Sequence, residues 1–249
     1  MIRAGFKSDI GMKRKNNEDS CFMMPREQVY MVADGVGGNN SGETASGLAV
    51  STIAERIKKK SPLSMKKDED VIGILKDCVE LANRKIINYG IKHPENKGMA
   101  TTIVMCCVKG NKAYFANAGD SRAYILRGGE LCQITEDHSF VNSLLKKGAI
   151  SPEEAMSHEK RNMITKALGA EDQVGADYYQ TDIKNGDIIL LCTDGLYGEV
   201  PEEELCEAIE KADDMSELAA TLVEMANCHG GRDNVTAVCL KVEGGYFNE

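Results

Sequence analysis

The 249-residue chain contains no tryptophan, only 5% aromatic residues and five prolines. Its longest apolar runs span about five to seven residues, far below the roughly 18 that a membrane-spanning helix needs. The first residues, MIRAGFKSDIG, lack the apolar core of a signal peptide. These absences predict a cytoplasmic protein without membrane insertion. With 42% hydrophobic residues over this length, we expect one globular domain covering residues 1–249.

Positive charge is also scarce, because 39 acidic residues outnumber 30 Lys and Arg residues and give a formal net charge of −9. A protein of this balance is not expected to bind a nucleic-acid backbone through a basic surface. The lack of tryptophan also removes one base-stacking side chain. We therefore expect no nucleic-acid partner. Part of the negative charge could serve as metal ligands, which composition alone does not decide.

The nine cysteines form no CxxC pair, and their number is odd. Several of them lie inside apolar runs, namely Cys106, Cys107, Cys192 and Cys239. This pattern indicates reduced thiols that act as small core residues. It disfavours both a zinc site and a disulfide framework.

Hydrophobic periodicity divides the chain into helical and extended parts. Period-3.6 patterns predict helices at 42–59, 70–89, 202–211 and 215–227. Short β-branched or apolar runs predict strands at 101–108, 112–118, 122–126, 130–135, 188–192 and 234–242. Brief turns between the first four strands predict an antiparallel meander, and Lys184–Gly186 predicts a further hairpin before residue 188. The expected fold class is α+β, with helix pairs covering packed, mostly antiparallel sheets.

Aspartates stand at the ends of several apolar strands, namely Asp19, Asp34, Asp120, Asp194 and Asp233. A carboxylate at a strand end, followed by glycine or another small residue, can approach a metal closely. Mg²⁺ and Mn²⁺ prefer such oxygen ligands, and two adjacent ions can lower the pKa of a bridging water. Because Asp-Gly is also a common turn, any one of these sites could be no more than a hairpin. Spacing alone does not establish that the five converge.

A series of motifs contains these aspartates. The first has the form DxGxxRxxNED and runs from Asp9 to Asp19. It is followed by ADGVGGNNSGETAS, GMATTIV, NAGDSRAY, EDHS, ITKALG, CTDGL and RDNVTAV. In this order the motifs resemble the PP2C (PPM) family of Ser/Thr protein phosphatases, in its stand-alone bacterial form. The resemblance extends from Gly5 to about Val242, and it implies a four-layer α-β-β-α β-sandwich and hydrolysis of phosphoserine and phosphothreonine in proteins.

By position, the resemblance implies a centre with two Mn²⁺ or Mg²⁺ ions. Asp34 would bridge both ions, and Gly35 would contribute its backbone carbonyl to one of them. Asp194 and Asp233 would complete the shell of the first ion.

Further acidic residues would support the same centre. The resemblance implies that Glu18 and Asp19 hold metal-bound waters, which orients such sites. It also implies that Asp120 binds a third and weaker ion together with Asp194.

Arg14 corresponds to the family's phosphate-binding arginine, and its planar guanidinium suits bidentate contact with phosphate oxygens. From the sequence alone, a solvated arginine within the basic run KRK is an equal alternative. The position inside the motif favours Arg14 over Lys13 and Lys15. The implied reaction is direct attack of a metal-bridging hydroxide on phosphorus, which displaces the serine or threonine alkoxide without a phosphoenzyme.

The sequence departs from the family at the residue proposed to protonate the leaving group, which is usually a histidine after Asp-Gly. Val36 occupies that position, and Asn39 occupies the position of a histidine found in many bacterial members. The general acid is therefore unassigned. A metal-bound water or a histidine could supply the proton, the candidates being His93, His138, His158 and His229. The neighbours of His138 predict a packing role.

Residues 139–161 resemble the family's flap beside the active site. The segment is charged and is expected to be partly helical, with Gly148 and Pro152 as breakers. Loops of this kind can gate access and select substrates. A plain surface insertion would have the same features.

Two other functions stay open at this point. The same carboxylates could serve a two-metal phosphoesterase that acts on small phosphate esters, and a catalytically weak relative could bind phosphoproteins. The presence of all the metal aspartates favours an enzyme. We expect a monomer that acts on phosphorylated proteins and opposes a membrane-bound Ser/Thr kinase.

Overall fold

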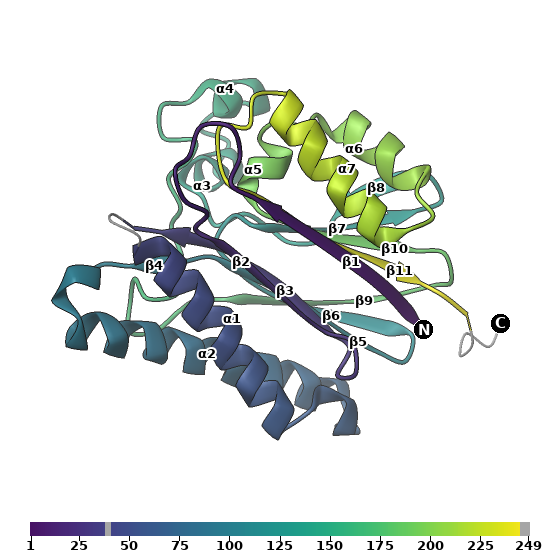
Figure 1. The fold of residues 1–249 in the computed structure, drawn as a ribbon, viewed down its shortest axis with the longest axis horizontal. Coiled ribbons are helices and arrows are strands. Elements are labelled where there is room, and N and C mark those ends of the chain that lie inside the picture. Colours follow the sequence, from purple (N-terminus) through teal and green to yellow (C-terminus); the bar gives the residue numbers. More distant parts are fainter. Residues whose placement is uncertain (38–40, 245–249) are drawn as a thin grey trace.

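The computed structural model describes residues 1–37 and 41–244, which form two antiparallel sheets with helices on their outer faces (Figure 1). The first sheet has the spatial order β1 (Ile2–Asp9), β11 (Val235–Val242), β10 (Ile188–Cys192), β7 (Arg122–Arg127) and β8 (Glu130–Gln133). The second has the order β2 (Asp19–Met24), β3 (Val29–Val36), β5 (Ile103–Lys109), β6 (Lys112–Ala118) and β9 (Asp177–Asp182). The short strand β4 (Ala100–Thr101) pairs with the end of β3.

Two helix pairs cover the sheets. The helices α1 (Ser41–Lys59) and α2 (Asp68–Lys92) lie on the second sheet, and α6 (Glu202–Glu210) and α7 (Met215–Cys228) lie on the first (Figure 1). The four predicted helices and the α-β-β-α arrangement are therefore confirmed. Shorter elements complete the described part, namely α3 (Phe140–Lys146), α4 (Pro152–Ser157), α5 (Asp194–Tyr197) and 3₁₀ helices at Pro62–Ser64 and Pro94–Asn96.

Three groups of buried apolar side chains fill the three interfaces between these four layers. In β3, Val29 and Met31 belong to the group facing α1 and α2, whereas Tyr30 and Val32 belong to the group between the sheets. Because both faces of the strand are covered, its sequence is continuously apolar instead of alternating. Full burial of each large apolar side chain contributes roughly 1.5–3 kcal/mol.

The predicted meander is wrong at one turn. The pairs β5–β6 and β7–β8 are hairpins, but β6 and β7 belong to different sheets. The turn from Gly119 to Ser121 therefore carries the chain from one sheet to the other. Gly119 has a φ of +112°, and a Cβ there would lie 2.5 Å from Cγ2 of Thr102, so the crossing requires glycine. It places Asp120 at the ends of strands from both sheets.

The hairpin predicted at Lys184–Gly186 is wrong in the same way. The turn exists, because the Asp187 N–H donates to the Lys184 carbonyl at 3.1 Å. It joins β9 to β10, however, and these strands lie in different sheets. Both errors have one cause: the residues of a turn predict that the chain reverses, and they do not specify the strand with which it then pairs.

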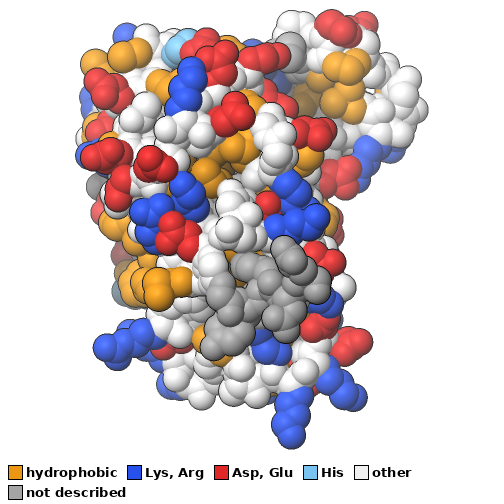
Figure 2. Space-filling view, turned by 90° about the vertical axis from the view of Figure 1, so that its right-hand side faces the viewer, with side chains coloured by type: hydrophobic (Ala, Val, Ile, Leu, Met, Phe, Trp, Pro, Cys, Tyr) orange, Lys and Arg blue, Asp and Glu red, His pale blue; other side chains and the backbone are white. Residues whose placement is uncertain are grey.

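The cysteines are reduced, as the sequence predicts, and the face seen in Figure 2 carries side chains of both charges. All nine cysteines are free, and burial raises the pKa of Cys107 and Cys192 to about 12. Figure 2 shows the end of the molecule at which the N-terminus lies, where acidic, basic and hydrophobic side chains are intermingled. Within residues 1–37 and 41–244, no helix has the length and apolar character needed to cross a membrane.

Candidate metal centre

Five aspartates from separate parts of the chain gather at one end of the two sheets. Asp19 and Asp34 are register partners in β2 and β3. Asp194 is the first residue of α5, directly after β10, and Asp233 precedes β11. Asp120 lies in the crossing turn between β6 and β7. The charges of the other four all act on Asp34, so the strand-end aspartates selected from the sequence do converge.

Burial and mutual repulsion disfavour the ionised forms of these carboxyl groups. Burial, followed by the charges of its four neighbours, raises the pKa of Asp34 well above its usual range. Burial also raises the pKa of Asp19 to about 7, against the opposing effect of two threonine hydroxyls. The pKa of Asp120 rises to about 7 through burial and the charge of Asp194. Bound cations would offset both the repulsion and the loss of hydration, so this cluster is suited to hold them.

Unpaired oxygens in the cluster also fit a metal. Oδ1 of Asp19 and Oδ1 of Asp194 are buried and have no hydrogen-bond partner in the part of the chain that the structure describes, which is costly for a polar atom. The donors are oxygens only, as Mg²⁺ and Mn²⁺ prefer. In the present side-chain arrangement, no three described acidic, His or Cys side chains form a complete ligand group. In this arrangement the Asp233 carboxylate is directed toward Arg14.

Glycines allow the backbone to pack directly against the carboxylates. A Cβ on Gly35 would lie 2.1 Å from the Gly42 oxygen, and a Cβ on Gly42 would lie 2.3 Å from Oε2 of Glu18. A Cβ on Gly195 would lie 1.9 Å from the Asn234 oxygen. Larger residues would push α1 and α5 away from the cluster. Sequence reasoning selected Gly35 for its carbonyl and missed Gly42 and Gly195, although both lie in motifs that it had quoted.

Two polar side chains that sequence reasoning missed hold the loops in place. The Asn234 amide accepts from the Glu18 N–H at 2.8 Å and donates to two main-chain oxygens of the first motif at 2.9 Å. Thr102 Oγ1 accepts from the Asp34 N–H at 2.9 Å, and the Thr102 N–H donates to the Asp34 oxygen at 2.9 Å. These bonds interrupt the predicted strand 101–108 at Thr102, so that it becomes β4 and β5. They fix the backbone at Glu18 and Asp34.

Asp19 is held from the first sheet. Its Oδ2 accepts hydrogen bonds from Thr193 at 2.9 Å and from Thr236 at 2.7 Å. Each of these threonines lies close to an aspartate of the cluster in the sequence, since Thr193 precedes Asp194 and Thr236 follows Asp233 by three residues. The contacts therefore connect the two sheets through one carboxylate.

Arg14 lies at the exposed rim of the cluster. Its Nη2 is 2.5 Å from Oδ2 of Asp233, and the two side chains are 49% and 35% exposed. An ion pair as exposed as this contributes little stability, so a phosphate can replace or share it. Lys13 and Lys15 are exposed and make no ion pair with other described residues. The geometry thus favours Arg14, as the motif did.

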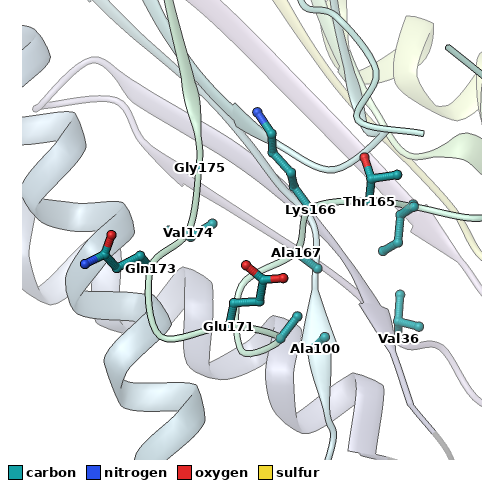
Figure 3. A pocket seen from close by; sticks show the side chains of 11 residues that line it. Val36, Ala100, Thr165, Lys166, Ala167, Glu171, Gln173, Val174 and Gly175 are labelled. Atoms are coloured by element: carbon teal, nitrogen blue, oxygen red, sulfur yellow. The ribbon is translucent and has the colours of Figure 1, made fainter. Parts of the chain in front are cut away.

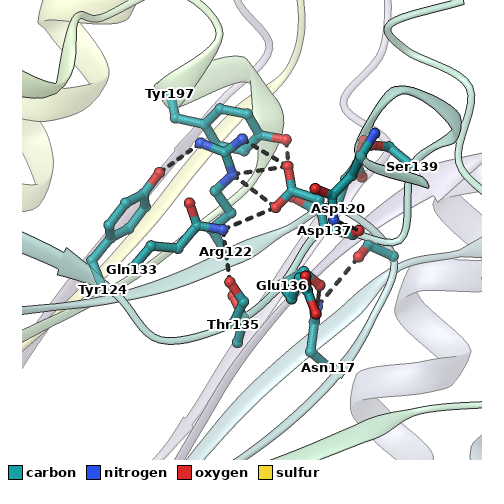
Figure 4. Close-up of polar contacts among 12 residues, drawn as sticks. Asn117, Asp120, Arg122, Tyr124, Gln133, Thr135, Glu136, Asp137, Ser139 and Tyr197 are labelled. Carbon is teal, nitrogen blue, oxygen red and sulfur yellow. Dashed lines mark hydrogen bonds and ion pairs between the residues drawn. The ribbon is translucent and has the colours of Figure 1, made fainter. Parts of the chain in front are cut away.

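A polar network lies beside Asp120 (Figure 4). The Tyr197 hydroxyl donates to the Asp120 backbone oxygen at 2.9 Å, and the Arg122 guanidinium stacks 3.6 Å from the centre of the Tyr197 ring. Arg122 also binds Asp137 through Nε at 2.9 Å and Nη2 at 2.7 Å, and it donates to the Tyr124 hydroxyl at 2.8 Å. Because Tyr197 ends α5, which begins with a clustered aspartate, the network connects two segments of the site. Sequence reasoning did not select any residue of this network except Asp120.

His138 is part of the framework of the site. It is 7% exposed, and its Nδ1 accepts from the Gly119 N–H at 3.1 Å. Its Nε2 therefore carries the hydrogen and faces Oδ2 of Asp177 at 3.0 Å. Burial lowers the pKa of His138. These contacts agree with the predicted packing role, in which the histidine supports the crossing turn.

Neither Val36 nor the histidines other than His138 are placed to act as the missing general acid at the aspartate cluster. Val36 is 45% exposed and has no proton to donate, and Asn39 lies outside the described residues. Each of the other three histidines contacts residues outside the aspartate cluster. His93 pairs with Glu95, His229 pairs with Glu204, and His158 packs on Phe140.

The segment at 139–161 contains the two short helices α3 and α4. Gly148 has a φ of +64° between them, and Ser151 caps α4 ahead of Pro152. The expected partly helical structure and its two breakers are confirmed. A bridge between Ser139 and Ile164 joins the ends of the segment. Its role as a flap stays a prediction.

An α-β-β-α sandwich with an all-oxygen cluster at one end is the arrangement expected of the metal-dependent phosphatases that the motifs resemble. The sequence profile of the family described as Protein phosphatase 2C matches residues 12–237. The chain therefore belongs to this family.

Named relatives support the assignment over nearly the whole chain. A serine/threonine phosphatase stp of Listeria monocytogenes is 35% identical over 243 residues, covering 96% of each chain. The serine/threonine protein phosphatase PstP of Mycobacterium tuberculosis is 37% identical over 245 residues, which are 97% of this chain and 45% of the relative.

Solved structures share the fold. The crystal structure of M. tuberculosis PstP/Ppp has a TM-score of 0.90 at 36% identity, covering 98% of this chain and 99% of that one. A structure of the PstP catalytic domain, described as a complex with two manganese ions, has a TM-score of 0.86 at 35% identity with the same coverage. The crystal structure of Stp1 from Staphylococcus aureus has a TM-score of 0.90 at 33% identity, covering 98% of this chain and 96% of that one.

Proposed function

We propose that the chain hydrolyses phosphoserine and phosphothreonine in proteins, with Mn²⁺ or Mg²⁺ as cofactor. The observation that carries the proposal is the buried cluster of five aspartates with Arg14 at its rim. A phosphate group brings negative charge, which such a cluster can accept only when cations are bound. The names of two relatives, serine/threonine phosphatase stp and serine/threonine protein phosphatase PstP, support protein substrates.

The residues present fit two metal ions. Asp34, Asp194 and Asp233 would be ligands through their carboxylates, and Gly35 through its carbonyl. Glu18 and Asp19 would orient water around the ions. Bound ions would supply positive charge that lowers the pKa of water and offsets charge on the phosphoryl group.

The chain's own residues then bind and orient the substrate. Arg14 would hold two phosphate oxygens with its fork of N–H donors, and it would exchange its contact with Asp233 for the phosphate. The hydrogen bonds of Thr102 and Asn234 would keep the backbone at Asp34 and Glu18 fixed during the reaction. No side chain is assigned to protonate the leaving alkoxide. With water as the nucleophile, attack on phosphorus would break the bond to the serine or threonine oxygen and release phosphate without a phosphoenzyme, and the leaving alkoxide would take its proton from solvent.

Metal dependence tests the proposal directly. The EDTA-treated protein is expected to be inactive toward p-nitrophenyl phosphate and toward phosphoserine and phosphothreonine peptides, and to gain activity with millimolar Mn²⁺ or Mg²⁺. The value of kcat/KM should be about tenfold or more higher for the peptides than for small esters, because remote contacts add binding energy. A preference for small esters or nucleotides would instead favour a small-molecule phosphoesterase. Peptide binding without turnover under any metal would favour a phosphoprotein-binding role.

Tyr197 provides a test of the Asp120 region. We propose that Asp120 and Asp194 hold a third, weaker ion, and that the Tyr197 hydroxyl positions the Asp120 backbone for it. Tyr197→Phe should therefore weaken binding of the weakest Mn²⁺ by about tenfold in calorimetric titration, in the range typical of residues behind a ligand. The two tighter sites should change little.

Tyr124→Phe is the matched control, because Tyr124 belongs to the same network and is more deeply buried than Tyr197, and its hydroxyl contacts Arg122 and not the Asp120 backbone. Equal effects of the two changes on Mn²⁺ binding would contradict the positioning role and indicate a general loss of packing.

We further propose that the enzyme acts as a monomer, is cytoplasmic and opposes a Ser/Thr kinase at the membrane. The phosphatase relatives support phosphoprotein substrates. Size-exclusion chromatography with light scattering would test the oligomeric state.

A further inference from the structure

A pocket of about 220 Å³ opens beside the aspartate cluster (Figure 3). Its apolar wall includes Val36, Ala100, Ala167 and Val174, and Lys166 and Glu171 supply its charged groups. Nothing in the proposed reaction requires this pocket. Its position and its charges indicate what it could bind.

The pocket lies next to the aspartate cluster along β3. Val36 follows Asp34 by two residues along β3, which corresponds to about 7 Å along a strand. Ala100 is the register partner of Val36, and the next residue, Thr101, donates its hydroxyl to the Asp34 oxygen at 2.8 Å. An extended peptide advances about 3.3–3.6 Å per residue. A substrate with its phosphate at the cluster would therefore reach the pocket with a side chain within about three residues of the phosphorylated one.

The two charged groups of the pocket differ in their partners. The Lys166 ammonium lies 3.1 Å from Nε2 of His138 and 3.4 Å from Oδ1 of Asp177, and Figure 3 shows it directed away from Glu171. The Glu171 carboxylate points toward Ala167 and the interior of the pocket. Within the described ranges it makes no ion pair or side-chain hydrogen bond.

The segment that carries Glu171 is anchored. The side chain of Asn83, which is 1% exposed on α2, donates to the Glu171 backbone oxygen at 2.9 Å and accepts from the Gly169 N–H at 2.7 Å. The carboxylate is thus presented from a fixed backbone, and its charge is not neutralised by a neighbour. A cationic partner with an apolar stem would complement both the carboxylate and the wall.

We propose that this pocket binds a lysine or arginine side chain located within about three residues of the phosphorylated residue in a protein substrate. The methylene groups would pack against Val36, Ala100 and Ala167, and the charged end would pair with Glu171. The wall explains why Val36 is apolar and 45% exposed at the edge of the site. This inference rests on the proposed protein phosphatase function, and it adds a preference for basic sequences near the phosphate.

The inference is tested with pairs of phosphopeptides, one containing arginine and the other citrulline at the same position. The position is varied from three residues before to three residues after the phosphoserine. Citrulline keeps the shape of arginine and removes its charge. The protein with Mn²⁺ should hydrolyse the arginine peptide with a kcat/KM about two- to fivefold higher at one or two positions, as expected for a partly exposed ion pair. Glu171→Gln should abolish this ratio, and Glu171→Lys should invert it.

Glu224→Gln on α7 is the matched control, because Glu224 is an exposed acid on the opposite helix layer. It should leave the ratio unchanged, and hydrolysis of p-nitrophenyl phosphate should be the same in every variant, since this ester is too small to reach the pocket. Equal rates for arginine and citrulline at all positions, or a ratio that survives Glu171→Gln, would overturn the inference and leave the phosphatase function intact. If neither peptide is hydrolysed, the proposed function itself fails, and the inference fails with it.

Discussion

Replacing Asp34 with asparagine is expected to abolish phosphatase activity and, at the same time, to stabilise the metal-free protein. Loss of a carboxylate proposed to bind two ions would remove several kcal/mol of transition-state charge stabilisation, which corresponds to a fall in kcat of about a thousandfold or more. In the absence of metal, the same carboxylate is unfavourable, because burial and four neighbouring carboxylates raise its pKa well above the usual range. An amide does not bear this cost.

The two effects are measured separately. Turnover is followed with saturating Mn²⁺, and thermal unfolding is followed in EDTA at pH 7.5. The Asp34→Asn protein should melt several degrees higher than the unaltered protein, since about 1 kcal/mol shifts the midpoint of a domain of this size by roughly 2–4 °C.

Asp187→Asn is the contrasting control. Asp187 is 3% exposed, lies at the opposite end of β10 from Asp194, and binds Arg127 through both oxygens at 3.0 and 2.7 Å. Its replacement should destabilise the protein by about 1–3 kcal/mol, because the hydrogen bonds between Arg127 and a buried carboxylate are lost, and should preserve turnover below the melting temperature. If Asp34→Asn were destabilising in EDTA as well, the aspartates would not be repelling one another as described.

The second large effect is a dependence of metal-free stability on pH. The pKa of Asp19 and that of Asp120 rise to about 7 from their ordinary value of 3.8, chiefly through burial. Below about pH 4 both groups are protonated in the folded and the unfolded chain. Between pH 4 and pH 7 the unfolded chain loses these protons and the folded chain keeps them, so the free energy of unfolding falls as pH rises. The difference amounts to about 1.4 kcal/mol per pH unit for each group.

Metal should reverse this trend. Divalent ions bind deprotonated carboxylates, so their affinity and their stabilising effect increase with pH. The rise in melting temperature caused by 1 mM Mn²⁺, an amount chosen as roughly saturating, should be larger at pH 7.5 than at pH 5.5. A metal effect independent of pH in this window would argue against carboxylate ligands with raised pKa values.

Other groups titrate in the same window, and a variant separates them. Burial lowers the pKa of His138, which makes the folded protein gain stability with rising pH and so opposes the effect of the aspartates. The Asp34→Asn protein retains His138 and loses the Asp34 carboxyl group, whose own pKa burial and its neighbours raise. Its stability in EDTA should therefore depend less on pH than that of the unaltered protein.

Local sequence was sufficient for most elements and for selecting the aspartates that the fold brings together. The four helices followed from period-3.6 patterns, and the strand-end aspartates were selected because oxygen ligands beside small residues suit hard cations. The motif around Arg14 favoured it over Lys13 and Lys15, and the geometry agrees because Arg14 reaches Asp233 at 2.5 Å. These properties depend on neighbours in the sequence, or on chemistry that a residue carries wherever it is placed.

The supporting residues could not be found in this way. Asn234 binds the Glu18 N–H across 216 positions of sequence, and Thr193 reaches Asp19 across 174. Tyr197 has the appearance of an ordinary helix residue, and its hydroxyl acquires a role only because β6 and β7 enter different sheets and place Asp120 beside it.

The sequence by itself therefore determined which segments are helical or extended, which aspartates stand at strand ends, and to which family the chain is similar. Only the tertiary structure decided which strands pair across each turn, that the five aspartates meet and raise one another's pKa values, and that Val36 and Glu171 share a pocket. The physical reason is the distance along the chain over which each interaction acts. Periodicity and turn residues act over a few positions, whereas burial, repulsion and pocket shape arise between segments that only folding brings together.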